Sequence, residues 1–490
     1  MKSDMRKLSR RECVALLGAQ AAAALLASCA GRRGPGESGD RPLVSSRFTR
    51  AFATPPVLAP TAVDIDADYY DLVAQPGVAE IMPGRRTDIW SYNGSFPGPT
   101  IVARRNRQSI VRVRNALPTP TAIHLHGGNT APDSDGFPTD MIMPGERRTY
   151  TYANRSRAAT LWYHDHVMGQ TGRDVYMGLA GLYLLRDEEE ESLGLPSGAH
   201  ELPVILQQRR FSEHGAFAYH EGDRIGVGGD VTLVNGVPWP RLEVEARPYR
   251  LRFVNASNAT RYLLRLSSGT PLILIGVDGG LLAAPVPCAA IPLAMGERAD
   301  VIVDFSAFGA GTVVDLVTGD LQDAGESLVR CVVGRRMGEM TVLPSHLSEV
   351  EVLSPTMAVG KRTFSFGASV ARAFPPVSWT INGRGFDPNV ALASARLGEC
   401  ELWTLQNHLG LGFAGMFHTV HLHLSPFQLL SRNGGPPAPH ERGWKDTVAL
   451  ERGERIDILT RFEGFRGKYL MHCHNLEHED HDMMARIDIV

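Results

Sequence analysis

A threefold internal repeat is the feature that most constrains the fold of this chain. Three landmarks recur in the same order: an Asn-Gly pair, an alternating strand that ends in Asn, and Gly-Glu-Arg followed by another strand. Asn-Gly favours a tight turn between strands, because both residues accept positive φ. The third landmark begins at Gly145, Gly296 and Gly453, about 150 residues apart, which is an ordinary domain size. The turns lie at Asn93, Asn235 and Asn382, and the strands end at Asn115, Asn255 and Asn407.

The repeat predicts an all-β protein of three consecutive Greek-key sandwich or barrel domains, because each unit combines period-2 strands with turn signals. The 490 residues include 50 Gly and 32 Pro, and long helical periodicities are scarce, which agrees with a turn-rich β protein. The domains are expected at residues 61–190, 200–345 and 360–490. The net charge of -3 gives no indication of a nucleic-acid partner, which normally requires a basic surface.

Residues 1–29 are predicted to be an export signal rather than part of the fold. The pair Arg10-Arg11 resembles a twin-arginine signal, although Cys13 stands where an aromatic residue is usual. The apolar run that follows ends at Cys29 in a sequence that resembles a lipobox, and the alternative is a plain signal that is cleaved elsewhere. We therefore expect an exported protein of the periplasm or cell envelope, with Cys29 as a candidate lipid anchor. Residues 30–60, rich in Gly, Pro, Ser and Arg, are predicted to form a flexible linker.

Three further cysteines are isolated in the sequence. Cys288, Cys331 and Cys400 are expected to be small buried apolar residues. Two of them could form a disulfide in an oxidising compartment, but three cannot all pair within the chain.

Ten of the 17 histidines lie in four short clusters. On a strand, residues i and i+2 point to the same face, so each His-x-His pair can present two imidazoles to one site. Eight such imidazoles exceed what a single metal ion can hold, and they favour a cluster of about three ions where the first and third domains meet. The clusters are His124 and His126; His164 and His166; His418, His421 and His423; and His472, His474 and His478.

The middle repeat lacks these ligands. His164 and His472 stand nineteen residues after Gly145 and Gly453, whereas the same position after Gly296 is Asp315. The first and third domains therefore share a metal-binding strand, and the second domain is predicted to be a scaffold.

Cys473 indicates a second kind of metal site. It lies between two clustered histidines, so its side chain faces the opposite side of the strand and must bind a different metal ion. Two His, one Cys and a long axial Met are the ligands of blue-copper electron transfer, whereas zinc more often takes four firm ligands. The cysteine then joins a site that accepts electrons to a multi-metal site through covalent bonds, which favours a catalyst over a storage protein. The other candidate ligands are His418, His478 and Met483.

These clusters, together with residues 96–101 (FPGPTI) and 443–447 (GWKDT), resemble the multicopper oxidases over nearly the whole mature chain. The resemblance implies three cupredoxin domains, four copper ions, and four one-electron oxidations coupled to the reduction of O2 to water. It implies type 1 ligands His418, Cys473, His478 and Met483, type 2 ligands His124 and His421, and type 3 ligands His126, His164 and His474 on one ion and His166, His423 and His472 on the other.

The resemblance also implies roles for three further residues. Asp135 and Glu479 match acids near the copper cluster that are expected to deliver protons. The simpler interpretations are a surface turn for Asp135 and a capping or solvated acid for Glu479. Thr419 stands where the family usually has Pro, and its additional N–H is expected to shift the type 1 potential without loss of a ligand.

The sequence indicates the reducing substrate less clearly than it indicates the acceptor O2. Residues 171–173 and 433–437 resemble cuprous oxidases, whereas residues 162–166 and 475–480 resemble bilirubin oxidases and spore-coat laccases. Cuprous oxidases commonly carry a methionine-rich insert, because thioethers hold cuprous ion. Here the corresponding region contains only Met337, Met340 and Met357.

Without that insert, we expect an open type 1 site and a laccase-like monomer that oxidises small phenolic or aromatic donors. One alternative is an oxidase for cuprous, ferrous or manganous ion. The other is a non-enzymatic copper-binding or structural protein. The complete ligand set and the position of Cys473 argue against this last alternative.

Overall fold

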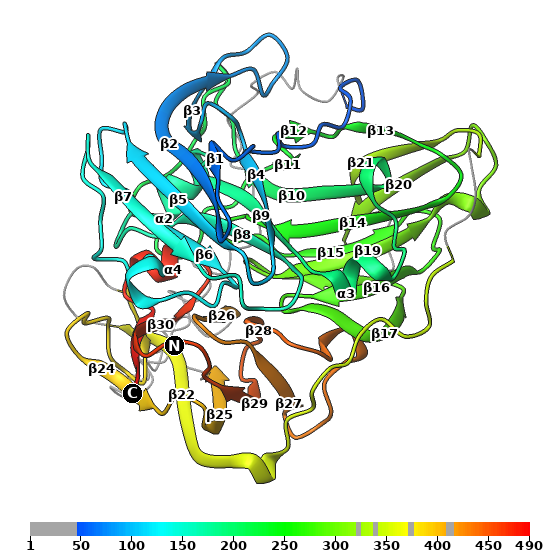
Figure 1. Ribbon diagram of the computed structural model, residues 1–490. Coiled ribbons are helices and arrows are strands. Elements are labelled where there is room, and N and C mark those ends of the chain that lie inside the picture. The colour runs from blue at the N-terminus through cyan, green and yellow to red at the C-terminus, as the bar shows by residue number, and fades with distance from the viewer. Residues whose placement is uncertain (1–46, 320–324, 337–341, 371–376, 408–415) are drawn as a thin grey trace, which may run out of the picture.

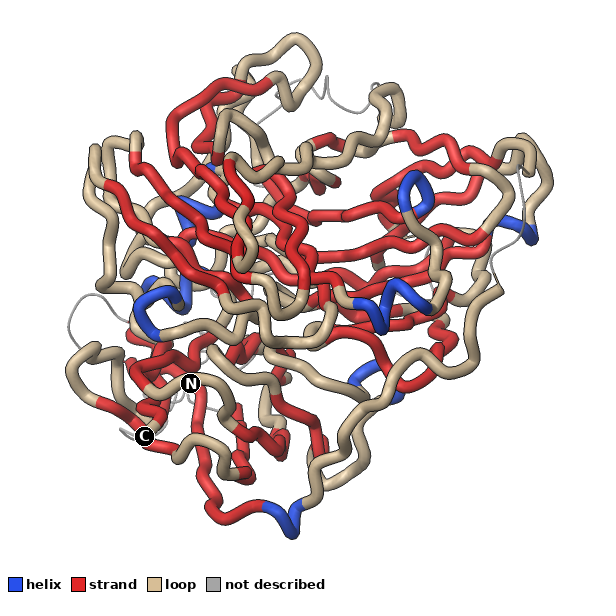
Figure 2. The backbone as a smooth tube through the Cα atoms, in the orientation of Figure 1, coloured by secondary structure: helices blue, strands red, loops and turns tan. Residues whose placement is uncertain are grey.

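The computed structural model describes residues 47–319, 325–336, 342–370, 377–407 and 416–490, and strands dominate it (Figures 1 and 2). The predicted signal with Cys29, residues 30–46 of the predicted linker, and Met337 and Met340 lie outside the described residues. The strands form six sheets, which follow one another in pairs along the chain. This arrangement confirms the prediction of three all-β, cupredoxin-like domains.

The first pair of sheets encloses a core that includes Tyr70, Val111 and Tyr183. One sheet contains β1 (Ala62–Val63), β2 (Ala67–Ala79), β3 (Thr87–Tyr92), β5 (Gln108–Asn115) and β7 (Arg147–Tyr152), and the other contains β4 (Gly98–Arg104), β6 (Ile123–His126), β8 (Ala159–Asp165) and β9 (Ala180–Arg186).

The second pair of sheets forms the middle domain. Cys288 and Cys331 belong to its hydrophobic core, and both are free, as is the buried Cys400 of the third domain. The alternative of a disulfide among them is therefore wrong. One sheet contains β10 (Glu201–Arg209), β11 (Val231–Val234), β12 (Val237–Pro238), β14 (Pro248–Asn255), β16 (Leu272–Val277), β17 (Gly280–Cys288) and β19 (Arg298–Asp304), and the other contains β13 (Arg241–Val244), β15 (Tyr262–Leu266), β18 (Ile291–Leu293), β20 (Val313–Thr318) and β21 (Glu326–Val333).

The third pair of sheets, yellow to red in Figure 1, ends the chain. Its first strand begins two residues before the predicted limit at 360. One sheet contains β22 (Ala358–Val370), β23 (Val377–Ile381), β25 (Cys400–Asn407), β27 (Phe427–Arg432) and β29 (Arg455–Arg461), and the other contains β24 (Ala391–Ala395), β26 (His418–Leu422), β28 (Thr447–Leu450), β30 (Gly467–Cys473) and β31 (Met484–Ile489).

The sequence landmarks occupy equivalent places in the three domains. Asn93, Asn235 and Asn382 all have positive φ, of 55°, 52° and 53°, as the predicted turns require. Each landmark strand pairs in parallel with the first long strand of its domain and antiparallel with the strand after Gly-Glu-Arg. In each domain, the residue nineteen positions after the glycine of Gly-Glu-Arg lies on a strand: β8, β20 or β30. These three strands are therefore structurally equivalent.

Helices are few and short. None of the helices in the described part of the chain is long and apolar enough to cross a membrane. They are α2 (Thr171–Met177), α3 (Glu188–Ser192) and α4 (Leu476–Asp480), with 3-10 turns at Pro132–Ser134, Gly198–His200, Phe305–Ala307, Pro355–Met357 and Pro439–Glu441.

The described end of the predicted linker is packed against the protein. The backbone N–H groups of Phe48 and Phe52 donate to the carbonyl oxygens of Trp239 and Arg241, at 3.0 and 2.8 Å. The Arg330 guanidinium lies 3.9 Å from the centre of the Phe48 ring. The N–H of Leu58 donates to the carbonyl oxygen of Thr100 in the first domain at 2.8 Å. This part of the predicted linker therefore differs from the expected flexible tether, because backbone hydrogen bonds and a cation–π contact hold it on the middle and first domains.

Candidate metal centre

Two pairs of neighbouring strands carry the clustered histidines. In the first domain β6 lies beside β8, and His124 is directly opposite His164. In the third domain β26 lies beside β30, and His421 is directly opposite His472. The equivalent position of the middle domain holds Asp315, which forms an ion pair with Arg330 at 3.0 Å. The middle domain thus uses this position for a structural contact, as the prediction of a scaffold domain requires.

The first group of ligand atoms joins the two outer domains. The Nε2 atoms of His124 and His421 lie 3.4 Å apart. Their Nδ1 atoms lie within hydrogen-bond distance of the carbonyl oxygens of Asp135 and Asp446, at 2.7 and 2.9 Å. When each Nδ1 carries the proton that it donates, both Nε2 lone pairs are directed at the same point.

Two further groups each contain three histidines. In one of them the Nε2 atom of His472 lies 3.4 Å from that of His166 and 3.1 Å from that of His423. In the other, one ring nitrogen from each histidine lies within 4.8 Å of those of its two partners. The members of this second group are His126, His164 and His474.

The bonding of these nitrogens tests whether a metal ion fits. His126 Nδ1, His164 Nε2 and both ring nitrogens of His474 are buried and have no hydrogen-bond partner within the described ranges. Buried polar atoms are normally bonded, so a set of unpaired nitrogens directed at one another fits metal ligation.

The fourth group lies on the other face of β30. Cys473 Sγ is 3.6 Å from His418 Nδ1 and 3.6 Å from His478 Nδ1, and these two nitrogens are 3.2 Å apart. The backbone of Met483 is tied to this group, because its carbonyl oxygen accepts from the N–H of Cys473 and its N–H donates to the carbonyl of His478, both at 3.0 Å. The alternation predicted for Cys473 and its neighbours is therefore present in the strand.

Burial keeps the imidazoles of His418 and His166 neutral. It lowers the pKa of His418 to about 3 and that of His166 to about 4, in the latter case against the opposing charge of Glu479. Neutral imidazole is the form that binds metal ions, so the burial of these side chains prepares them for ligation before any ion arrives.

Asp135 and Glu479 both touch the histidines. Asp135 Oδ2 lies 2.8 Å from His423 Nδ1, and burial raises the pKa of this carboxyl to about 8, against a hydrogen bond from Thr130. Glu479 Oε2 lies 3.0 Å from His472 Nδ1, and burial raises the pKa of Glu479 as well. Both side chains are fully buried, which excludes a surface turn and a solvated acid as their interpretation.

The group around Cys473 is covered rather than open. His418 is 2% exposed and His478 is 0% exposed. His478 Nε2 lies 3.0 Å from the carbonyl oxygen of Ile225, a residue of the middle domain, and the Trp379 ring stacks on His478 at 3.8 Å. The expectation of an open type 1 site is therefore wrong, because a loop of another domain and a tryptophan close it.

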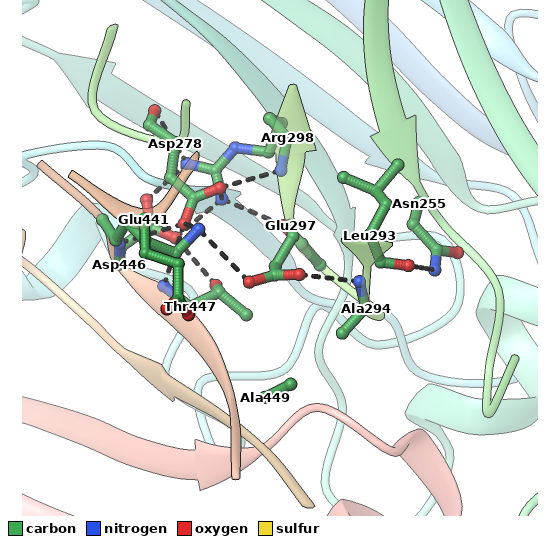
Figure 3. Close-up of polar contacts among 12 residues, drawn as sticks. Asn255, Asp278, Leu293, Ala294, Glu297, Arg298, Glu441, Asp446, Thr447 and Ala449 are labelled. Carbon is green, nitrogen blue, oxygen red and sulfur yellow. Dashed lines mark hydrogen bonds and ion pairs between the residues drawn. The ribbon is translucent and has the colours of Figure 1, made fainter. Parts of the chain in front are cut away.

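Arg298 and Asp446 form a buried ion pair beside the histidines that the sequence did not predict. Arg298 Nη1 donates to Asp446 Oδ1 at 2.6 Å (Figure 3). Asp446 Oδ1 also lies 3.2 Å from His126 Nε2. Burial alone raises the pKa of Asp446, but the Arg298 charge outweighs it and holds this pKa well below its usual range. Both residues lie in motifs of the sequence, Gly-Glu-Arg and Trp-Lys-Asp-Thr, but nothing in the sequence indicated that these motifs meet.

Known proteins share both the sequence and the fold. Residues 74–190 and 363–490 match two family models, each described as multicopper oxidase. A laccase of Bacillus stratosphericus is 34% identical over 91% of this chain and 99% of its own length. A bilirubin oxidase of Albifimbria verrucaria is 36% identical over 85% of this chain and 76% of its own.

The crystal structure of a laccase from Pediococcus acidilactici superimposes with a TM-score of 0.83 at 33% identity, and covers 94% of this chain and 95% of its own. The four groups of ligand atoms thus occur in a chain whose relatives match most of its length. The chain therefore belongs to the multicopper oxidases, copper-dependent oxidoreductases that use O2 as electron acceptor.

Proposed function

We propose that this oxidase takes electrons from small phenolic or aromatic donors at a type 1 copper and delivers them to O2 at a trinuclear cluster. The observation that supports this most directly is the position of Cys473. Its Sγ belongs to one group of ligand atoms, while the ring nitrogens of His472 and His474 belong to two others. Electrons can therefore pass between the groups through the covalent chain.

The histidine and cysteine ligands are assigned from the four groups of atoms, and Met483 from the resemblance to the family. Copper supplies the redox chemistry when bound, and the chain positions the ions. The type 1 ion would be held by His418, Cys473, His478 and Met483, the type 2 ion by His124 and His421, and the type 3 pair by His126, His164 and His474 and by His166, His423 and His472.

Asp135 and Glu479 are proposed to hold and release the protons that the reduction of O2 consumes. Asp135 Oδ2 lies at hydrogen-bond distance from Nδ1 of His423, and Glu479 Oε2 lies in an ion-pair contact 3.0 Å from Nδ1 of His472. Because burial raises the pKa of both carboxyls, they keep a proton to higher pH than exposed acids do. An acid with a raised pKa is suited to proton transfer near neutral pH.

The kinship with laccases and a bilirubin oxidase supports an organic donor. Direct contact between a donor and His478 is blocked, since its outer nitrogen bonds to the Ile225 carbonyl. Electrons from an organic donor would therefore enter over the Ile225 peptide or the Trp379 ring, both of which touch His478.

The same cover supports the second candidate, oxidation of cuprous, ferrous or manganous ion. A small metal ion bound at the surface needs no contact with His478 to transfer an electron. The two candidates are separated by O2 uptake of the copper-loaded protein with a phenol and with cuprous ion, at matched concentrations. Faster uptake with the phenol supports the first candidate, and faster uptake with cuprous ion supports the second.

We also propose that the protein is exported and anchored to the cell envelope through Cys29. The twin-arginine pair and the lipobox-like sequence support this proposal. Fractionation of cells that express the full chain, with Cys29→Ser as control, tests it. Membrane association of the native chain that the substitution abolishes is expected, and equal distribution of both would contradict lipid anchoring.

A further inference from the structure

Arg298 is the arginine of the Gly-Glu-Arg landmark in the middle domain, which supplies none of the proposed copper ligands. In the two outer domains the equivalent residues, Arg147 and Arg455, are exposed. Arg298 is 1% exposed. The middle copy of the repeat thus buries a charge that the other copies leave in solvent, and burial of an arginine is costly unless its charge and its donors are paired.

The donors of Arg298 reach all three domains. Nε donates to the carbonyl oxygen of Thr160 in the first domain at 3.1 Å. Nη1 and Nη2 donate to the Gly296 and Asp278 carbonyls of the middle domain, at 2.9 and 3.1 Å. Both of these nitrogens also donate to the Asp446 carboxylate of the third domain, as Figure 3 shows. The Arg298 side chain therefore forms hydrogen bonds with all three domains.

Asp446, which Arg298 holds in place, contacts two of the histidines. Its Oδ1 lies 3.2 Å from Nε2 of His126, and its backbone carbonyl lies 2.9 Å from Nδ1 of His421. The neighbouring Thr447 hydroxyl donates to Asp446 Oδ1 at 2.8 Å and lies 3.0 Å from the same His126 nitrogen. Because the Thr447 hydroxyl gives its one proton to Asp446, it accepts from His126 Nε2, so His126 carries its proton on Nε2 and leaves Nδ1 to face the cluster.

The rest of the middle domain supports the same segment. Asp278 Oδ2 accepts from the backbone N–H groups of Asp446 and Thr447, both at 3.3 Å, and forms an ion pair with Lys445 at 3.0 Å. The landmark turn itself touches the cluster: a Cβ on Gly296 would lie 2.9 Å from the His474 ring and 3.0 Å from the His126 ring. The middle domain is thus built against the histidines without supplying one.

We propose that Arg298 is a positioning residue. Through Asp446 it orients histidines that bind the type 2 copper and the adjoining type 3 copper. The proposal rests on the ligand assignment given above. Arg298 holds the Asp446 carboxylate in place with two hydrogen bonds, and Asp446 then sets, through its carboxylate and its carbonyl, which nitrogen of His126 and of His421 binds metal. The scaffold domain supplies in this way the charge that orients a histidine from each of the outer domains. Groups that orient metal-binding histidines typically alter metal affinity or activity by about 10- to 100-fold.

The test compares Arg298→Met with Arg250→Met. Arg250 is a matched control, since it is also a buried arginine of the middle domain, with ion pairs to Asp300 and Glu190 and, among the described residues, no hydrogen bond or ion pair to a histidine. For each copper-loaded variant, copper per chain, the paramagnetic resonance signal of type 2 copper, the absorption band of type 1 copper and the thermal unfolding midpoint are measured. Arg298→Lys is included, because it keeps the charge but loses the forked pairing.

Arg298→Met is expected to weaken copper binding at the type 2 site by about 10- to 100-fold and to lose or alter the type 2 signal, with the type 1 band retained. Arg298→Lys is expected to restore part of the signal, and Arg250→Met to keep it despite a comparable loss of stability. If Arg298→Met does not fold, the Lys variant decides the question through an altered type 2 signal.

An unchanged type 2 signal and copper content in the folded Arg298 variants would overturn the proposal, as would an equal loss in Arg250→Met. These outcomes are distinct from failure of the proposed function, which would show as the absence of type 1 and type 2 signals in the unsubstituted protein.

Discussion

The side chains of His472 and Cys473, neighbours in the sequence, leave β30 on opposite faces. Nε2 of His472 lies 3.1 Å from Nε2 of His423, whereas Sγ of Cys473 lies 3.6 Å from the Nδ1 atoms of His418 and His478. A single peptide unit therefore separates a blue-copper group from a histidine cluster.

The carboxyl groups beside the cluster should control the reaction with O2 and not the reaction with the donor. Glu479→Gln keeps the shape of the side chain but removes its exchangeable acid. We expect reduction of type 1 copper by a phenol to be unchanged and its reoxidation by O2 to slow by about 10²- to 10⁴-fold. Stopped-flow measurement of the type 1 band in each half-reaction checks this.

The control for Glu479 is Glu477→Gln on the same helix. Glu477 is also buried, but it accepts from Asn258 and from the backbone of Val227 instead of contacting a cluster histidine. Reoxidation as slow in Glu477→Gln as in Glu479→Gln would assign the effect to damage of the helix. Asp135→Asn is expected to reproduce the slow reoxidation, because Asp135 contacts His423.

Thr419 should raise the type 1 potential. Burial raises the pKa of the Cys473 thiol to about 12, and hydrogen bonds from the backbone N–H groups of Asn475 and Thr419 oppose this rise. Such bonds withdraw electron density from the sulfur and so favour reduced copper. Thr419→Pro removes one donor, and we expect the potential to fall, by about 59 mV if the equilibrium constant changes tenfold.

A redox titration followed through the type 1 absorption band measures this change. Thr419→Val is the matched control, since it keeps both the backbone N–H and the branched side chain. An unchanged potential in a folded Thr419→Pro variant that retains its type 1 band would show that this N–H does not tune the site.

Glu190 should make stability depend on pH in the acid range. Burial raises the pKa of Glu190, but the charges of Arg252 and Arg250 outweigh burial and hold it at about 2, below the ordinary value of 4.5. A folded-state pKa below the unfolded value stabilises the fold above pH 4.5, and this contribution is lost as the pH falls towards 2. At about 1.4 kcal/mol per pKa unit, the contribution at neutral pH is about 3 kcal/mol.

We therefore expect Glu190→Gln to lower the unfolding midpoint in urea at pH 7, and this difference from the native protein to shrink as the pH falls below 4.5. Glu188→Gln, an exposed change on the same helix, should have little effect at any pH. A Glu190→Gln difference that stays constant between pH 7 and pH 3 would assign the loss to packing instead of charge.

Removal of one histidine should affect one part of the centre. His421→Ala deletes a proposed type 2 ligand from β26, whereas His418 on the same strand faces the other group. We expect loss of the type 2 signal and of about one copper per chain, with the type 1 band preserved. His214→Ala is the control, because the side chain of His214 is 82% exposed. Loss of the type 1 band in His421→Ala would contradict the separation of the two groups.

Local patterns in the sequence predicted the repeated turns and landmark strands and the histidine clusters, whereas the assignment of ligands to separate ions came from the resemblance to the family. The Asn-Gly turns and the alternation around Cys473 depend only on neighbouring residues, and both occur in the structure. The features that were missed depend on how the domains pack. The cover of His478 by Ile225 and the pairing of Arg298 with Asp446 join residues about 250 and 150 positions apart, which no local pattern can indicate.

The most direct test of the central claim is O2 consumption by the copper-loaded protein with a phenolic donor, compared with Cys473→Ser. The account predicts sustained uptake in the native protein, with about four electrons taken from the donor for each O2. It predicts loss of this uptake in Cys473→Ser, while the histidine groups still bind copper. A fully copper-loaded native protein that consumes no O2 with a phenol or with cuprous ion, or a Cys473→Ser variant that is as active as the native protein, would contradict it.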